Sequence, residues 1–391
     1  MRYRRVMGCA MMCAVAACGH GSGNLDGMLA EGRLDDVLRE SAKCLESAPE
    51  RLDCLVARAR ALDTLGRVGE AAAAWHSVVN VEATHTEAWE RLIAYVEDLP
   101  APSFALELIG TAAPPGHAVG ADRHQLWSLQ VQRAESIMAV GQAMLHGAEW
   151  GSGLKALRDA AALDAGGSQF REALCLALFG AARRGETAAE RLAPLREIIT
   201  LCSDMRLLPS VQDRLREHGE RGREFLAREE EALAAARTYS PWPGARFDAT
   251  VDTCSFYPRI EFRCDETKSA DIAMDFPAQS PQHTVVGERV SLLQYPSPAA
   301  PSVGMLKGSP SVIVIEEQGD YRLVSVAGLK GWVQSGSIAQ KHRFTAEIRP
   351  RGSMELRVRP AKANVRVDVA GLNVFRGEVD LKPYVVYRWS F

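Results

Sequence analysis

The segments Gly32-Arg33-Leu34-Asp35-Asp36 and Gly66-Arg67-Val68-Gly69-Glu70 repeat one pattern near the start of this 391-residue chain. They are 34 residues apart, and the same offset joins Cys44 to Val78. From Leu25 to about Arg237 the chain is rich in Ala, Leu, Arg and Glu, with apolar residues at helical spacing. A fixed offset of this length predicts a stack of helix pairs, each burying one face against the next.

The repeated pattern resembles the tetratricopeptide repeat, a helix-turn-helix unit of that period. In this resemblance the glycine lies at the turn, Ala71 lies where the two helices touch, and Trp75 is the large partner four residues later. Trp89 stands where the family prefers Trp, and the segment 150–164 matches the second helix of a further repeat. Prolines at 100, 102, 114 and 115 interrupt the array. We therefore expect two recognisable repeats and then degenerate helical hairpins to Arg237.

The resemblance implies a curved solenoid over residues 18–237, whose concave surface binds peptides or protein helices. On the 34-residue register, first helices are expected at about 52–65 and 87–96. Exposed candidates for binding on these helices are Arg58, Asp63, Glu90 and Arg91. The alternative is that these charges are merely solvated. Core packing is the expected role of the tryptophans at 75, 89 and 150.

Residues 238–246 are expected to be a linker, because prolines at 241 and 243 and Gly244 cannot continue a helix. The next segment, 247–283, is expected to contain a hairpin over Thr250 to Asp265 with Pro258 in its turn. Cys254 would then face Cys264 across the ladder, which favours a disulfide between them.

Residues 284–340 resemble a bacterial SH3 domain, a small β-barrel. Gly304 leads into the strand Ser311-Val312-Ile313-Val314-Ile315, and Lys330-Gly331-Trp332-Val333 closes the pattern. The resemblance implies a surface that contacts cell-wall material or protein, with Tyr295, Tyr321 and Trp332 as candidate binding residues. The alternative is that these aromatic residues fill the barrel. Ser291, Leu293 and Asp320 depart from the residues that the family often has there.

Residues 341–391 alternate apolar and polar side chains, as in Val365-Arg366-Val367-Asp368-Val369. This predicts a second antiparallel β unit, which could form a sandwich with 247–283. The chain is therefore expected to be multidomain, α then β: an N-terminal tetratricopeptide-like α-solenoid followed by antiparallel β domains including an SH3-like barrel.

Residues 1–17 have the layout of a signal peptide: basic residues up to Arg5 precede a short apolar run from Val6 to Ala17. The run ends in Val15-Ala16-Ala17-Cys18, which resembles the lipobox of bacterial lipoproteins. The resemblance implies cleavage before Cys18 and a lipid on its sulfur. It also implies an envelope location, and Gly19 after the cysteine favours the outer membrane, facing the periplasm. The alternative is an ordinary secretory signal.

Beyond residue 18, six cysteines remain, an even set that suggests disulfides in an oxidising compartment. As sequence neighbours they would pair as Cys44 with Cys54, Cys175 with Cys202, and Cys254 with Cys264, although other pairings are formally open. The alternative for the cysteines in helical segments is that they are small buried apolar residues. Without a C-x-x-C or Cys/His cluster, a zinc site is not expected.

Composition and motifs argue against several function classes. Cleavage after residue 17 leaves 43 basic and 49 acidic residues, a net charge of -6, which gives no footprint for nucleic acid. The lipid on Cys18 is the expected membrane attachment, because no later segment is long and apolar enough to span a bilayer. Histidines are scattered singly, and neither a nucleophile elbow nor a nucleotide-binding loop occurs. We expect neither an enzyme nor a cofactor.

Two functions remain open. The first is an envelope scaffold that holds a protein or peptide partner in its helical repeats. The second is a peptidoglycan-binding protein or cell-wall hydrolase accessory, in which the β half binds and the helices act as a spacer.

Overall fold

The computed structural model describes residues 23–110, 121–147, 149–237, 247–264, 269–278, 280–308, 310–326 and 329–391. The signal segment 1–17, Cys18 and the linker 238–246 lie outside the described residues. The chain divides into two compact units, with the boundary after Tyr95. The described part of the first unit is residues 23–95, and the second unit contains 96–110 and everything described from 121 onward.

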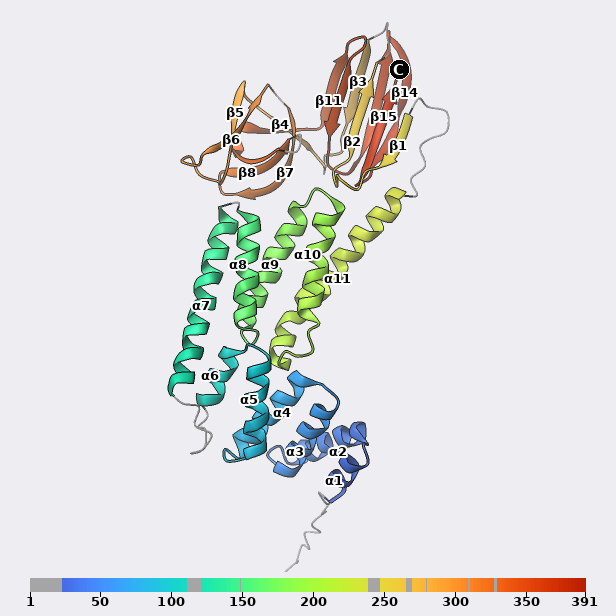
Figure 1. The fold of residues 1–391 in the computed structure, drawn as a ribbon. Coiled ribbons are helices and arrows are strands. Elements are labelled where there is room, and N and C mark those ends of the chain that lie inside the picture. Colours follow the sequence, from blue (N-terminus) through green and yellow to red (C-terminus); the bar gives the residue numbers. More distant parts are fainter. Residues whose placement is uncertain are drawn as a thin grey trace, which may run out of the picture. The chain divides into compact units, whose positions relative to one another are not determined.

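The first unit is built of antiparallel helix pairs (Figure 1). Its helices are α1 (Gly23–Ala30), α2 (Leu34–Ser47), α3 (Leu52–Thr64), α4 (Val68–Val81) and the first turns of α5 (Thr86–Asp98). The expected first helices at about 52–65 and 87–96 correspond to α3 and α5.

The 34-residue offset is explained by two identical helix ends. Gly32 and Gly66 have φ values of +72° and +68°, the left-handed region that glycine adopts without a Cβ penalty. After α3, the N–H of Arg67 bonds to the carbonyl of Leu62 and the N–H of Gly66 to that of Asp63. This is the Schellman pattern, and the corresponding bonds recur after α1 at Gly32. The glycines therefore lie at the turns, as the resemblance implied.

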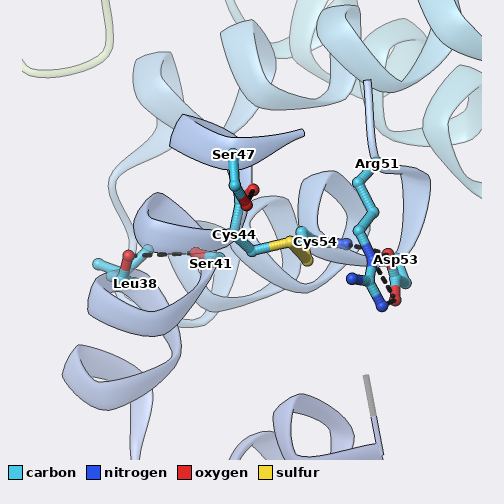
Figure 2. The surroundings of a disulfide bond; sticks show 7 residues. All are labelled: Leu38, Ser41, Cys44, Ser47, Arg51, Asp53 and Cys54. Atoms are coloured by element: carbon cyan, nitrogen blue, oxygen red, sulfur yellow. Dashed lines mark hydrogen bonds and ion pairs between the residues drawn. A yellow bond between two sulfur atoms is a disulfide. The ribbon is translucent and has the colours of Figure 1, made fainter. Parts of the chain in front are cut away.

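A disulfide joins the second and third helices. Cys44 on α2 and Cys54 on α3 are bonded across a sequence separation of 10, and Figure 2 shows the bond beside the Arg51–Asp53 ion pair. Trp75 and Trp89 are each 1% exposed, so both belong to the core.

The second unit begins with further helices: α6 (Pro102–Gly110), α7 (Ala121–His146), α8 (Trp150–Leu163), α9 (Ser168–Arg184), α10 (Ala188–Cys202) and α11 (Pro209–Arg237). They pack mainly against their sequence neighbours. Helices α7 and α8 approach closely where Gly153 lies, because a Cβ there would be 2.9 Å from the carbonyl oxygen of Gly141. A capping box of Thr187 and Glu190 begins α10.

Cys175 on α9 and Cys202 on α10 face each other with their sulfurs 3.8 Å apart, as thiols. The disulfide expected between them is not formed in this structure. Cys175 is buried, as its alternative role in packing requires.

Two four-stranded sheets follow within the described residues, and they share one core (Figure 1). The first has the order β1 (Phe247–Val251), β15 (Val385–Ser390), β2 (Arg259–Arg263) and β12 (Ser353–Arg357). The second has the order β11 (Arg343–Ile348), β3 (Ala270–Asp275), β13 (Ala361–Val369) and β14 (Leu372–Leu381). Phe262 stacks on Trp389 with ring centroids 5.0 Å apart. The two ends of the β half thus form a sandwich.

The expected hairpin over 250–265 is wrong. Strand β15 lies between β1 and β2, pairing antiparallel with β1 and parallel with β2. As a result Cys254 is exposed while Cys264 is buried, with its thiol directed at the carbonyl of Ile348, and the predicted disulfide between them is not formed. Local symmetry about Pro258 was misleading, because the strand that completes the ladder comes from the far end of the chain.

A curved seven-stranded antiparallel sheet is inserted in the sandwich between β3 and β11. Its order is β10 (Ile338–Lys341), β4 (Gln282–Val285), β7 (Ser311–Gln318), β8 (Tyr321–Val326), β9 (Leu329–Gln334), β5 (Arg289–Leu293) and β6 (Ser302–Lys307). A short 3-10 turn over 335–337 precedes β10. Its own small core contains Leu292, Val314, Val324 and Val333.

Candidate functional site

A groove of about 430 Å³ lies on the first unit, between helices α1, α3 and α5. The residues that line it are Asp26, Leu29, Ala30, Arg60, Asp63, Thr64, Glu87 and Arg91. These helices are the first members of successive helix pairs, so the groove is formed by the face that the resemblance predicted to be concave.

The repeat explains why these positions meet. Asp26 on α1 is 34 residues before Arg60 on α3, and Leu29 stands at the same offset before Asp63. Equivalent positions of consecutive repeats present their side chains to the same side of the stack. The offset thus accounts for the lining residues of α1 and α3, whereas Glu87 and Arg91 of α5 stand at other positions of the repeat.

Ion pairs cross the groove from helix to helix. The guanidinium of Arg60 donates from Nε to Glu87 Oε1 at 3.1 Å and lies 4.0 Å from Asp26 Oδ1. The hydrogen bond from Arg60 holds the pKa of Glu87 below its usual range. The same bond raises the pKa of Arg60. Both groups are thus charged at neutral pH.

A second ion pair in the groove joins Asp63 to Arg91, and the core residue Trp75 fixes its carboxylate. Asp63 Oδ2 is 3.6 Å from Arg91 Nε and also accepts a hydrogen bond of 2.8 Å from the indole nitrogen of the buried Trp75. Because Trp75 fixes Asp63, this carboxylate is an ordered acceptor on the groove wall. Arg91 is freer, with 57% of its side chain exposed.

The structure brings together only some of the predicted binding residues. Asp63 and Arg91 line the groove, whereas Arg58 and Glu90 do not. Arg58 is two residues from Arg60, which places it about 200° further around α3, and it is half-buried. Sequence reasoning missed Asp26, Arg60 and Glu87, and the offset of 34 between Asp26 and Arg60 is the signal that could have found the first two.

The candidate residues of the SH3-like segment differ in exposure. Trp332 is 1% exposed and so is a packing residue, as its alternative role requires. Tyr295 and Tyr321 are half-buried. In the part of the chain that the structure describes, no cluster of His, Cys, Asp and Glu could hold a metal ion. None of the described helices is long and apolar enough to cross a membrane.

No protein-family model matches the sequence, and no curated protein matches it. Among solved structures, the TPR domain of P58(IPK) is similar, with a TM-score of 0.36 and 14% identity over 55% of this chain and 55% of that one. MamA has a TM-score of 0.20 and 13% identity over 53% of this chain and 96% of its own. MamA residues 41 to the end from Desulfovibrio magneticus RS-1 also score 0.20, at 15% identity, over 54% and 94% of the two chains. This chain thus spans about half the length of the P58(IPK) domain. Scores this low assign neither fold nor function, and the tetratricopeptide-like character rests on the helix pairs and their 34-residue offset.

Proposed function

We propose that this protein is a non-enzymatic scaffold that binds an extended segment of a partner protein in the groove between α1, α3 and α5. The observation that carries the proposal is that α1, α3 and α5, the first helices of successive pairs, line one open groove with charged side chains. The core is filled by apolar residues such as Trp75 and Leu92, and of the charged side chains of the groove Asp63 is the one shown to accept a hydrogen bond from it.

The charges indicate the kind of segment that would bind. Three carboxylates, at 26, 63 and 87, stand beside the guanidiniums at 60 and 91. Asp26 is 81% exposed at its side chain and Arg91 57%, so the two offer opposite charges to a ligand. Exposed ion pairs contribute little free energy, so exchanging them for partner contacts costs little. A segment that carries both basic and acidic side chains fits this wall.

The scaffold would act in the bacterial envelope, held by lipid on Cys18. The basic start, the short apolar run and the sequence Val15-Ala16-Ala17-Cys18 support this location. Stable anchoring needs more than one acyl chain. Incorporation of labelled palmitate, with Cys18→Ala as the control, tests the anchor, and label retained by the variant would exclude this site.

The groove is tested by site-specific photo-crosslinking in cells that make the full chain. A benzophenone amino acid at Thr64, which lines the groove, is compared with one at Asn80, an exposed residue of the second helix α4. We expect a discrete crosslinked protein from position 64 and none from 80. Equal crosslinking at the two positions would contradict the proposal.

Charge reversal provides the matched functional arm. Arg60→Glu combined with Arg91→Glu should weaken the crosslink at least about fivefold, the loss of roughly 1 kcal/mol at a used interface. Arg39→Glu is the control, because Arg39 is also an exposed, ion-paired arginine but lies on α2. The double variant must keep the circular dichroism spectrum of the wild type, and unchanged crosslinking would overturn the assignment.

The alternative, a peptidoglycan-binding accessory, depends on the inserted sheet. The burial of Trp332 speaks against an aromatic binding surface there. Sedimentation with purified sacculi separates the two proposals: binding that is lost with Tyr321→Ala would favour the accessory.

A further inference from the structure

A second cleft, of about 250 Å³, lies in the second unit between α9, α10 and α11. We propose that it binds a small organic carboxylate with an apolar body, such as an arylalkanoate. The proposal does not depend on the groove of the first unit, because the two sites lie in different units.

The floor of the cleft is apolar and aromatic. Phe179 on α9 and Phe225 on α11 meet edge to face, with ring centroids 5.7 Å apart. Leu195 on α10 is 2% exposed and completes the wall. The volume is just below the about 300 Å³ at which pockets for drug-sized ligands begin. It therefore suits one ring or a short chain, with the remaining atoms at the rim.

The rim is strongly cationic. The guanidinium carbons of Arg183, Arg221 and Arg228 lie 6.0, 5.5 and 5.7 Å from the centroid of the Phe225 ring. Three like charges around one ring repel each other, and in the described part of the chain neither Arg183 nor Arg221 forms an ion pair with a carboxylate. Arg228 pairs with Glu224, but their side chains are 64% and 59% exposed, so this pair is weak.

The one carboxylate that lines the cleft is already satisfied. Glu229 is paired through Oε1 with Arg191, and its Oε2 accepts a hydrogen bond of 2.8 Å from Tyr384. Arg191 in turn stacks on Phe256, with its guanidinium carbon 3.6 Å from the ring centroid. Both oxygens of Glu229 are therefore engaged, by Arg191 and by Tyr384.

An external anion would supply a counter-charge for Arg183 and could replace the exposed Glu224 on Arg228. Arginine binds carboxylates through two parallel N–H···O bonds. In this cleft the apolar floor would exclude water from one side of such a pair. A ring attached to that carboxylate by a short chain would lie against Phe179 and Leu195. The combination of an aromatic floor with Arg183 and the weakly paired Arg228 thus selects for ligands that have both parts.

The test uses calorimetric titration of the full chain with 3-phenylpropionate. Two matched probes each lack one part: 3-phenylpropionamide keeps the ring without the charge, and propionate keeps the charge without the ring. We expect binding of 3-phenylpropionate, with each matched probe weaker by at least about tenfold, because one hydrogen-bonded charge or one buried ring is worth that much. No binding of 3-phenylpropionate at about 10 mM, or equal binding of the amide, would overturn the proposal.

Variants locate the site. Arg183→Gln combined with Arg228→Gln should lower the affinity at least about tenfold. Arg216→Gln is the control, since Arg216 is an exposed, ion-paired arginine on α11 that does not line the cleft. Unchanged affinity in a double variant with a wild-type circular dichroism spectrum would contradict this location. If the double variant does not fold, Arg183→Gln alone decides, because Arg183 is exposed and its removal breaks no ion pair among the described residues.

Discussion

The hydroxyl of Tyr384 donates a hydrogen bond of 2.8 Å to Glu229, a residue 155 positions earlier in the chain. Tyr384 directly precedes strand β15 and is fully buried, and Glu229 lies on helix α11. The bond therefore joins the β-sandwich to the last helix of the same unit. Arg191 completes the contact through its pair with Glu229.

Tyr384→Phe should destabilise the second unit by about 1.5–3 kcal/mol, the usual value of a hydrogen bond to a charged group. The ring stays in place, so only the hydroxyl is lost. Denaturant unfolding measures the change, with Tyr295→Phe as a control because Tyr295 is half-buried in the loop after β5. A midpoint unchanged by Tyr384→Phe would show that this contact does not stabilise the unit.

Gly66→Ala should destabilise the first unit by about 1 kcal/mol, because Gly66 has a φ of +68° that a residue with a Cβ adopts only at a cost. A Cβ at Gly66 would contact nothing within 4 Å, so the effect is confined to the backbone. Gly27→Ala is the matched variant: Gly27 lies in α1, also has open space, and should stabilise by about 0.5–1 kcal/mol. Thermal unfolding should therefore shift in opposite directions for the two variants.

The ion pair between Glu87 and Arg60 should make the stability of the first unit depend on pH. The pKa of Glu87 is lowered from 4.5 by its hydrogen bond with Arg60. A carboxylate with a lowered pKa stabilises the folded state above its unfolded pKa and loses this contribution as the pH falls through the folded value. The first unit should thus lose stability below about pH 4.5 more steeply than the Glu87→Gln variant does.

A double-mutant cycle with Arg60→Gln attributes this effect to the pair. Each single variant should make the loss of stability at low pH less steep, and the double variant should show little further change beyond either single variant. Additive effects would mean that Glu87 and Arg60 are not coupled.

Reduction of the Cys44–Cys54 disulfide should destabilise the first unit by about 2–3 kcal/mol, the chain-entropy value for a loop closed across a separation of 10 residues. Thermal unfolding with and without a reductant measures it. The Cys44→Ser, Cys54→Ser variant should unfold at the temperature of the reduced wild type and be insensitive to reductant. Equal stability of the oxidised and reduced wild type would contradict this assignment.

Mild oxidation should link Cys175 to Cys202 but leave Cys254 unlinked to Cys264. The first two sulfurs are 3.8 Å apart, so a small movement of α9 against α10 closes the bond of about 2 Å. Cys264 is buried and Cys254 exposed, on segments separated by β15. Peptide mass spectrometry under non-reducing conditions decides both points, and a Cys254–Cys264 peptide would contradict the strand order.

The helix pairs of the first unit were determined by the sequence itself. Helical spacing of apolar residues and a glycine at a helix end are local properties, which is why the offset between Gly32 and Gly66 predicted both turns correctly. The same offset predicts which face forms the groove, but it does not select the residues: Arg60 lines the wall, and Arg58, which the sequence suggested, does not.

Only the tertiary structure decided the strand order and the second cleft. Strands β1 and β2 are near neighbours in sequence, yet each reaches its pairing partner, β15, more than a hundred residues later. Backbone pairing over such distances leaves no local pattern, so symmetry about Pro258 pointed to the wrong ladder. Arg183, Phe225 and Arg228 likewise read as ordinary residues of separate helices, and they form a cationic aromatic cleft only because α9 and α11 pack side by side.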